Sequence, residues 1–110
     1  MGASKKDFFT DEQNEYAILF RALAHPARVA IVEYLMGVGS CICGDIVSEL
    51  PLAQPTVSQH LKELKNAGLI RGNIDGNSIC YCLEENSFEK LQSYISAISV
   101  KLQNKKQICC

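Results

Sequence analysis

Long apolar runs are absent from this 110-residue sequence, and none approaches the roughly 20 residues that a transmembrane helix needs. The first residues, MGASKKDFF, also lack the apolar core of a secretory signal peptide. We therefore expect no membrane partner and a cytoplasmic location. Internal repeats, linkers and low-complexity segments are missing as well, so the length favours a single domain.

The sequence also has no large excess of positive or negative charge, because it contains 11 Lys and Arg residues and 12 Asp and Glu residues. The resulting net charge of −1 does not by itself indicate a nucleic-acid-binding protein. Locally the balance differs: residues 54–71 contain three basic side chains against one acidic side chain, with His60 besides. A basic face is therefore predicted on a nearly neutral protein.

Cysteine is abundant, with six residues in the chain. Because no signal peptide is present, the disulfide framework of a small secreted protein is not expected. Reduced thiols that bind a metal or carry out redox chemistry are favoured instead. The six residues form three pairs: Cys41 with Cys43, Cys80 with Cys82, and Cys109 with Cys110.

Apolar residues at helical spacing predict helices over residues 11–23 and about 26–36, and a last helix up to about residue 104. Asn86 or Ser87 is predicted to cap the last helix. Its apolar residues recur at alternating spacings of three and four, which is typical of a coiled-coil seam. This seam suits either its own domain or a second subunit, and consists of Phe88, Leu91, Ile95, Ile98 and Leu102.

A helix-turn-helix is indicated between these helices by a short helix over residues 45–50, the turn Pro51-Leu52-Ala53 and a second helix over residues 55–67. Gly68 ends the second helix. A helical wheel turns Val57, Leu61 and Leu64 towards the core. The same wheel turns a polar set outward, namely Pro55, Thr56, Ser58, Gln59 and Lys62.

Two strands over residues 70–74 and 78–83 flank Asp75-Gly76-Asn77, which is a strong hairpin signal. The order helix, helix, helix-turn-helix, hairpin, helix predicts a mainly α winged helix-turn-helix fold. Its domain would span residues 11–104, between a flexible N-terminus at 1–10 and a cysteine-containing tail at 105–110.

Helix-turn-helix proteins place the N-terminal half of the second helix in the major groove of DNA. We therefore predict that this chain binds double-stranded DNA through its second helix and its hairpin. Short polar and amide side chains suit base edges, and basic ones suit phosphates. The predicted DNA-binding residues are Gln54, Thr56, Ser58, Gln59, His60, Lys62, Lys65, Arg71, Asn73 and Asn77.

The segments LAHPARVAIVEYL and AQPTVSQHLKELKNAGLI, with a hairpin ending in YCL, resemble the arsenic-repressor (ArsR/SmtB) family of bacterial metal-responsive repressors. The resemblance covers about residues 16–83. It implies a homodimer through the first and last helices, which binds a palindromic operator and releases it when a ligand binds. The family's zinc site on the last helix is predicted to be absent, because His25 and His60 lie elsewhere.

Cys41-Ile42-Cys43 matches the Cys-x-Cys thiol site that this family carries at the entry to the helix-turn-helix. Thiolates select soft ions, and the resemblance implies trivalent arsenic or antimony in preference to Cd(II) or Zn(II). Some arsenic repressors have a further cysteine where this chain has Ile46. The candidates for a third ligand are therefore Cys80, Cys82, Cys109 and Cys110.

Two thiols at positions i and i+2 share a face only in an extended segment. We therefore hypothesise that chelation holds residues 41–43 extended and pulls on the short helix, which moves the recognition helices. The nearest alternative is a thiol redox or reactive-sulfur sensor on the same scaffold.

Two further alternatives belong to other classes. A thiol oxidoreductase is disfavoured because Cys-x-Cys is not Cys-x-x-Cys, and no Gly-rich phosphate loop or nucleophile elbow is present, so we predict no enzyme. A winged helix that binds only protein is disfavoured by the polar, basic face of the second helix.

Overall fold

A computed structural model describes residues 8–38, 42–43, 50–75 and 78–105. The predicted short helix over residues 45–50 and both terminal segments lie largely outside these ranges. None of the described helices is both long and apolar enough to cross a membrane. The elements are α1 (Asp11–Leu23), α2 (Pro26–Val38), β1 (Ile42–Cys43), α4 (Gln54–Ala67), β2 (Ile70–Asp75), β3 (Ser78–Leu83) and α5 (Glu85–Lys105).

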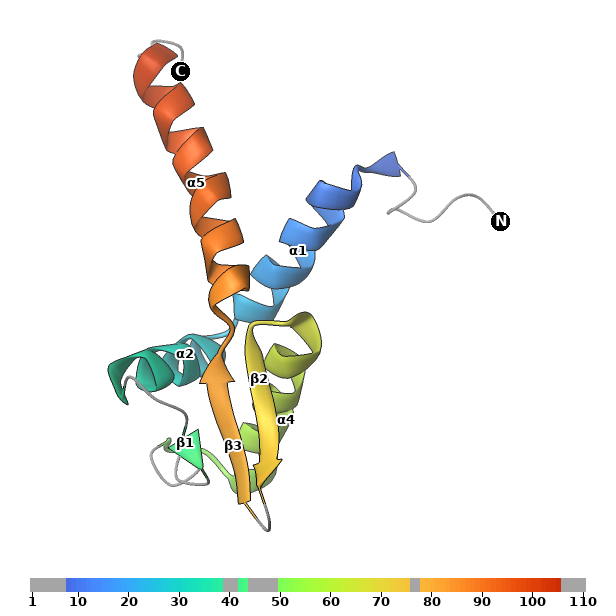
Figure 1. The fold of residues 1–110 in the computed structure, drawn as a ribbon, viewed down its shortest axis with the longest axis vertical. Coiled ribbons are helices and arrows are strands. Elements are labelled where there is room, and N and C mark those ends of the chain that lie inside the picture. Colours follow the sequence, from blue (N-terminus) through green and yellow to red (C-terminus); the bar gives the residue numbers. More distant parts are fainter. Residues whose placement is uncertain (1–7, 39–41, 44–49, 76–77, 106–110) are drawn as a thin grey trace.

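Helix α2, helix α4 and a small sheet form the body of the molecule, from which α1 and α5 diverge as two arms (Figure 1). The predicted winged helix-turn-helix fold, mainly α with a small β-hairpin, is confirmed. The described helices also match the predicted ranges closely, and α1, α2 and α4 each have a local signal at one end. At α1, for example, the hydroxyl of Thr10 accepts a hydrogen bond from the backbone of Gln13, and the Gln13 side chain accepts one from Thr10.

Helix α4 is amphipathic, and its apolar side is buried. Val57, Leu61 and Leu64 are 0%, 3% and 0% exposed, as the sequence predicted. The helix starts without a side-chain cap at Ala53, whose carbonyl accepts the N–H groups of the first turn. It ends at Gly68, whose φ of 87° lies in the left-handed region that glycine adopts without strain.

The sheet is antiparallel, with strand order β1-β3-β2. Strands β2 and β3 form the predicted hairpin, with Ile70 opposite Leu83 at its base. Strand β1 pairs with the other side of β3, where Ile42 lies opposite Tyr81 and Cys43 lies opposite Cys80. The sequence did not predict this third strand, which joins the segment before the helix-turn-helix to the wing.

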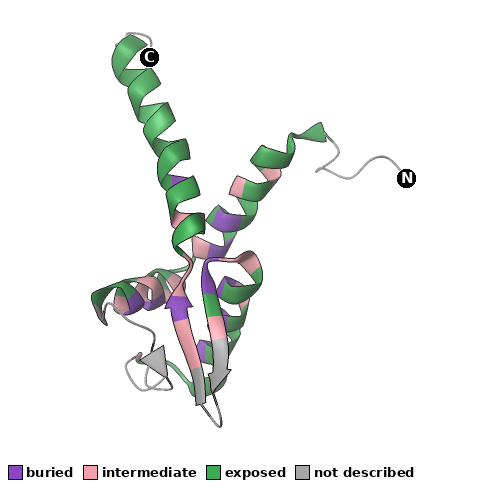
Figure 2. Ribbon diagram, in the orientation of Figure 1, coloured by how far each residue is buried: buried purple, intermediate pink, exposed green. Residues whose placement is uncertain are grey.

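The core lies where the helices meet the base of the hairpin, and the outer parts of both arms are exposed (Figure 2). Burying an apolar side chain fully stabilises the fold by about 1.5–3 kcal/mol, so this cluster holds the body together. Every described helix and β2 contribute to it. Its members are Leu19, Ala22, Ile31, Leu35, Val57, Leu61, Leu64, Leu69, Ile70 and Leu91.

Helix α5 begins at Glu85, so the predicted cap at Asn86 or Ser87 is wrong. The Ser87 hydroxyl donates a hydrogen bond to the carbonyl of Gly68 instead. Both predicted residues lie inside the first turn of α5, after its cap position, and the Ser87 hydroxyl joins α5 to the end of α4.

His60 on α4 contacts α2 and the turn before it. The Arg28 guanidinium donates a hydrogen bond from Nε to Nδ1 of His60 at 3.1 Å, and the rings of His25 and His60 lie 4.3 Å apart. Because Nδ1 accepts this bond, the geometry suits a neutral imidazole. Burial lowers the pKa of His60 below its ordinary value of 6.5, and electrostatic repulsion from His25 and Arg28 lowers it further.

This cluster predicts a loss of stability in mild acid. The unfolded chain takes up a proton at His60 near pH 6.5, whereas the folded chain takes it up only at lower pH. The unfolded state is therefore stabilised relative to the folded state as the pH falls below 6.5, so the folded protein loses stability. In urea unfolding at about pH 7.5 and about pH 5.5, the free energy of unfolding should fall more steeply for the wild type than for His60→Asn, which keeps an acceptor but does not titrate. Equal losses in both proteins would contradict the assignment.

Candidate nucleic-acid interface

The side of α4 opposite the core is polar and open to solvent. The exposed residues on this side agree with the predicted outward set, and include Gln54, Thr56, Ser58, Gln59, Lys62 and Lys65. Among them Gln59 donates a long hydrogen bond of 3.5 Å to Glu63, one turn further along the helix. The first two turns therefore present two small hydroxyls and two amides, and the later turns present two ammonium groups. Such side chains can bond base edges and phosphates respectively.

His60 differs from the other predicted DNA contacts. Its side chain is only 8% exposed and lies against His25 and Arg28. It occupies the border between the apolar and the polar side of α4, where the helical wheel alone does not decide burial. His60 is therefore not proposed as a DNA contact.

The hairpin stands next to α4 because their ends are bonded together. The backbone of Leu69 donates to the Leu64 carbonyl at 3.0 Å, and the backbone of Glu84 donates to the Leu69 carbonyl at 2.9 Å. Of the predicted wing contacts, Arg71 is exposed and lies 3.6 Å from the Glu84 carboxylate. Such an exposed ion pair is weak, so the guanidinium remains able to exchange partners. Asn77 and the side chain of Asn73 lie outside the described residues.

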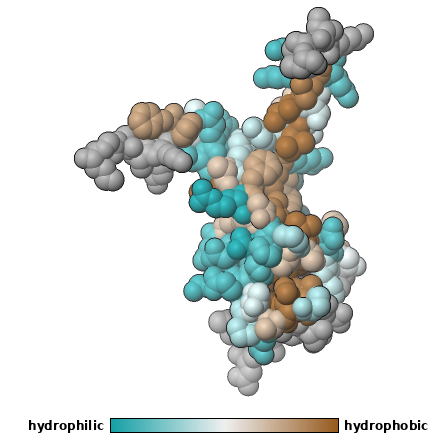
Figure 3. All heavy atoms as spheres, turned by 180° about the vertical axis from the view of Figure 1, so that it is seen from behind, coloured by the Kyte–Doolittle hydropathy of each residue, from teal (hydrophilic) through white to brown (hydrophobic). Residues whose placement is uncertain are grey.

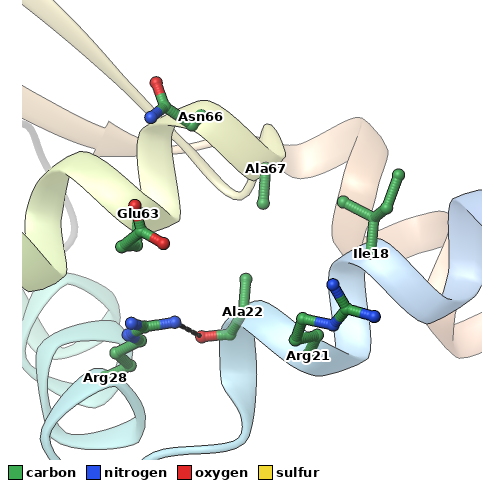
Figure 4. Close-up of a pocket in the computed structure, with 7 residues that line it drawn as sticks. All are labelled: Ile18, Arg21, Ala22, Arg28, Glu63, Asn66 and Ala67. Atoms are coloured by element: carbon green, nitrogen blue, oxygen red, sulfur yellow. Dashed lines mark hydrogen bonds between the residues drawn. The ribbon is translucent and has the colours of Figure 1, made fainter.

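A shallow pocket lies between α1, α2 and α4, on the side away from the hairpin (Figure 4). The Arg28 guanidinium, which lines this pocket, already makes two hydrogen bonds: Nη1 donates to the Ala22 carbonyl at 3.3 Å, and Nε donates to His60. The pocket therefore offers an ordinary polar surface and no evident reactive group. It is lined by Ile18, Arg21, Ala22, Arg28, Glu63, Asn66 and Ala67.

The structure places Cys43 in the same sheet as the second cysteine pair, Cys80 and Cys82. The backbone of Cys43 lies directly opposite Cys80, and Cys82 lies two residues further along β3. Both Cys80 and Cys82 are disulfide-bonded, and Cys82 is buried, with 8% exposure. The side chain of Cys43 lies outside the described residues, as do Cys41, Cys109 and Cys110.

Within the described residues, no group of three or more His, Cys, Asp or Glu side chains is placed to hold a metal ion. The predicted thiol site at Cys41 and Cys43 falls largely on undescribed residues, and so it stays a prediction. What the sequence analysis missed is that β1 pairs with the wing. The matching Cys-x-Cys spacing in the two segments is the signal that could have suggested this pairing.

The two arms carry apolar side chains that the described chain leaves uncovered (Figure 3). Near the body the arms contact each other, since the rings of Tyr16 and Tyr94 stack at 4.3 Å. Further out, Ile95, Ile98 and Leu102 are 48%, 40% and 48% exposed. The predicted seam therefore begins in its own domain and continues along a free face of α5.

Comparison with known proteins agrees with this arrangement. The model for "Bacterial regulatory protein, arsR family" matches residues 25–71. The HTH-type transcriptional repressor SmtB of Mycobacterium tuberculosis is 44% identical over 68 residues, which cover 62% of this chain. The chain spans only 50% of the length of that relative.

A cadmium resistance transcriptional regulatory protein, a CadC homolog of Staphylococcus aureus, is 30% identical over 89 residues, covering 80% of this chain and 73% of the relative. Among solved structures, an ArsR-like transcriptional regulator from Rhodococcus sp. RHA1 superposes with a TM-score of 0.73 at 21% identity, covering 87% of this chain and 90% of that one. The chain therefore belongs to the arsR family of bacterial regulatory proteins, whose matched members are transcriptional regulators and not enzymes.

Proposed function

We propose that this protein is a cytoplasmic transcriptional repressor that binds double-stranded operator DNA as a homodimer. A soft metal or metalloid bound by cysteine thiolates releases it from the operator, and trivalent arsenic or antimony is favoured over Cd(II) or Zn(II). The observation that carries the DNA-binding part is the exposed polar side of α4, which is held outward by three buried apolar residues on its other side.

DNA recognition rests on the first half of α4. Thr56, Ser58 and Gln59 are exposed there, and they are short enough for the helix to approach base edges in the major groove. Lys62 and Lys65 follow on the exposed side and supply phosphate contacts. The wing adds Arg71 at the base of the hairpin, with Asn73 and Asn77 as further proposed contacts.

Dimerisation through α1 and α5 is proposed from the uncovered apolar side chains of both arms. Ile18 on α1 is 53% exposed, and the outer seam of α5 is similarly open. A second copy would remove these side chains from water. The dimer would also present two α4 helices to successive major grooves, which lie roughly 34 Å apart.

The inducer is proposed from the thiols. A related regulator is named for cadmium resistance, which is compatible with soft-ion chemistry in this family. A second candidate is a redox-sensing repressor. It is favoured by one observation, namely that Cys80 and Cys82 are each in a disulfide. The two candidates differ in whether a reduced protein responds to an ion without any oxidant.

Lys62→Ala should weaken binding to DNA from upstream of the gene and, to the same extent, to DNA of other sequences. Lys101→Ala should not weaken binding to either. Removing a phosphate contact lowers the number of released counterions, so the slope of log K against log salt should decrease by about one for each subunit on the DNA. Fluorescence anisotropy at several salt concentrations measures both quantities. Lys101 on α5 is the matched control because it is an exposed lysine outside the proposed interface. Equal effects of the two substitutions would argue against α4 as the recognition helix.

Ile98→Glu should convert the dimer to a monomer without unfolding the chain. The side chain is 40% exposed in the single subunit, so a carboxylate is tolerated there, but an apolar interface would desolvate it. Sedimentation equilibrium gives the mass, and circular dichroism checks the fold. Ser93→Glu adds the same charge on another side of α5, and it should stay dimeric. A dimeric Ile98→Glu protein would exclude this face as the interface.

The double variant Cys41→Ser/Cys43→Ser should bind the operator with unchanged affinity and no longer be released by arsenite. The reason is that these thiols are proposed to bind the inducer and not the DNA. Anisotropy of the reduced protein on DNA, titrated with arsenite, then Cd(II) and Zn(II), and finally peroxide, tests this. Release of the wild type by peroxide alone would replace the metalloid by redox sensing. Loss of operator binding in the variant would contradict the proposed separation of roles.

A further inference from the structure

We propose that the wing completes the inducer site, with Cys43 of β1 and Cys80 and Cys82 of β3 as three thiolate ligands of one trivalent arsenic. This inference rests on the proposed function and revises its ligand set: of the pair Cys41 and Cys43 it keeps Cys43, and it takes the other two ligands from the wing. The sequence left four candidates for a third thiol, two in the wing and two in the C-terminal tail. The tertiary structure distinguishes between these two pairs.

Strand register places the wing thiols beside Cys43. Cys80 is its direct partner in the antiparallel ladder, and directly opposite residues have Cβ atoms roughly 4.5–5.5 Å apart on one face of the sheet. Cys82 is two positions along the same strand, and strand residues two apart share a face. Three cysteine positions from two strands therefore lie together on one face of the sheet.

The wing sulfurs are also close to other sulfurs. Cys80 and Cys82 are each disulfide-bonded, so each sulfur lies within bonding reach of the sulfur of another cysteine. Thiols that converge closely enough to form disulfides are, when reduced, also placed to share one soft ion. The 8% exposure of Cys82 adds partial shelter from water, which limits competition from solvent ligands.

The tail pair is too far away within one subunit. Helix α5 has 21 residues and is therefore roughly 30 Å long. It points away from the sheet, as Figure 1 shows. Cys109 follows Lys105 by four residues, which span at most about 14 Å when fully extended. The tail of the same subunit therefore cannot return along α5 to β1 and β3.

Ligand exchange at this site balances without any redox step. Arsenous acid, As(OH)₃, reacts with three thiols to give As(SR)₃ and three water molecules. Three As–O bonds break and three As–S bonds form, each thiol proton leaves with a hydroxide as water, and arsenic stays trivalent. The thiols must be reduced beforehand, so disulfide formation and arsenic binding exclude each other at Cys80 and Cys82.

Bound arsenic would tie the entry of the helix-turn-helix to the wing. Strand β1 lies ahead of α4 in the chain, whereas β3 leads into Glu84, whose backbone is bonded to Leu69 at the end of α4. Ligation across β1 and β3 therefore fixes the position of the segment before α4 relative to the segment after α4. A change in the orientation of the recognition helix follows, and DNA affinity should fall by an amount typical of allosteric coupling, roughly 5- to 150-fold.

The test compares five full-length proteins, each reduced with a trialkylphosphine: wild type, Cys43→Ser, Cys80→Ser, Cys82→Ser and the matched control Cys109→Ser/Cys110→Ser. Arsenite is the probe. Binding is measured by the near-ultraviolet sulfur-to-arsenic charge-transfer absorbance, and release by anisotropy on operator DNA. The wild type and the tail variant should bind one arsenic per subunit and leave the DNA. The other three variants should bind DNA normally and need at least about tenfold more arsenite, since each lacks one ligand.

Unchanged operator binding in each variant verifies its fold. If burial at Cys82 makes its serine variant unstable, Cys80→Ser carries the test alone. Normal arsenite sensitivity of Cys80→Ser together with loss in the tail variant would overturn the wing site in favour of the tail, while the proposed repressor function would stand. A reduced wild type that binds DNA but gives no charge-transfer band would contradict the metalloid inducer itself. If only Cys43→Ser loses its sensitivity to arsenite, the wing thiols are not ligands, while the proposed repressor function stands.

Discussion

Burial of one side of α4 is the constraint on which the rest of the structure depends. Val57 and Leu64 are completely buried and Leu61 nearly so, and each contributes on the order of 1.5–3 kcal/mol in a domain that is small. Because the apolar side of α4 is packed in the core, its polar side must face the solvent. The exposed hydroxyls, amides and ammonium groups of the candidate interface are therefore a consequence of core packing, and rotating the helix would expose its apolar residues.

The end of α4 is the joint that connects the interface to the other elements. Gly68 turns the chain there, its carbonyl accepts the Ser87 hydroxyl of α5, and Leu69 is bonded to Glu84 at the base of the wing. Helix α4, the hairpin and the long arm thus share a few backbone groups. A ligand that changes the wing acts close to this joint, as does a second subunit that holds α5. This shared attachment offers one physical route by which the proposed thiol chemistry and the proposed dimerisation would both influence DNA binding.

The sheet and the arms leave different groups available for function. Along the arms, aromatic contacts join Tyr16 and Phe20 to Tyr94, but the described residues leave the outer apolar side chains of α5 exposed. In the sheet, the pairing of β1 with β3 brings Cys43 opposite Cys80, although the two residues are far apart in the chain. The proposed dimer uses the first feature, and the proposed metalloid site uses the second.

Local patterns in the sequence were enough to predict the described helices, the hairpin and the outward side of α4, because helical periodicity and glycine act over a few residues. They also indicated the family. They did not determine the start of α5, the burial of His60 or the third strand. Ser87 takes a partner at Gly68, and His60 is buried because Arg28 and His25 reach it from the α2 region. Pairing of β1 with β3 joins residues almost forty positions apart, and such a contact depends on how the helices and hairpin pack, which only the tertiary structure decides.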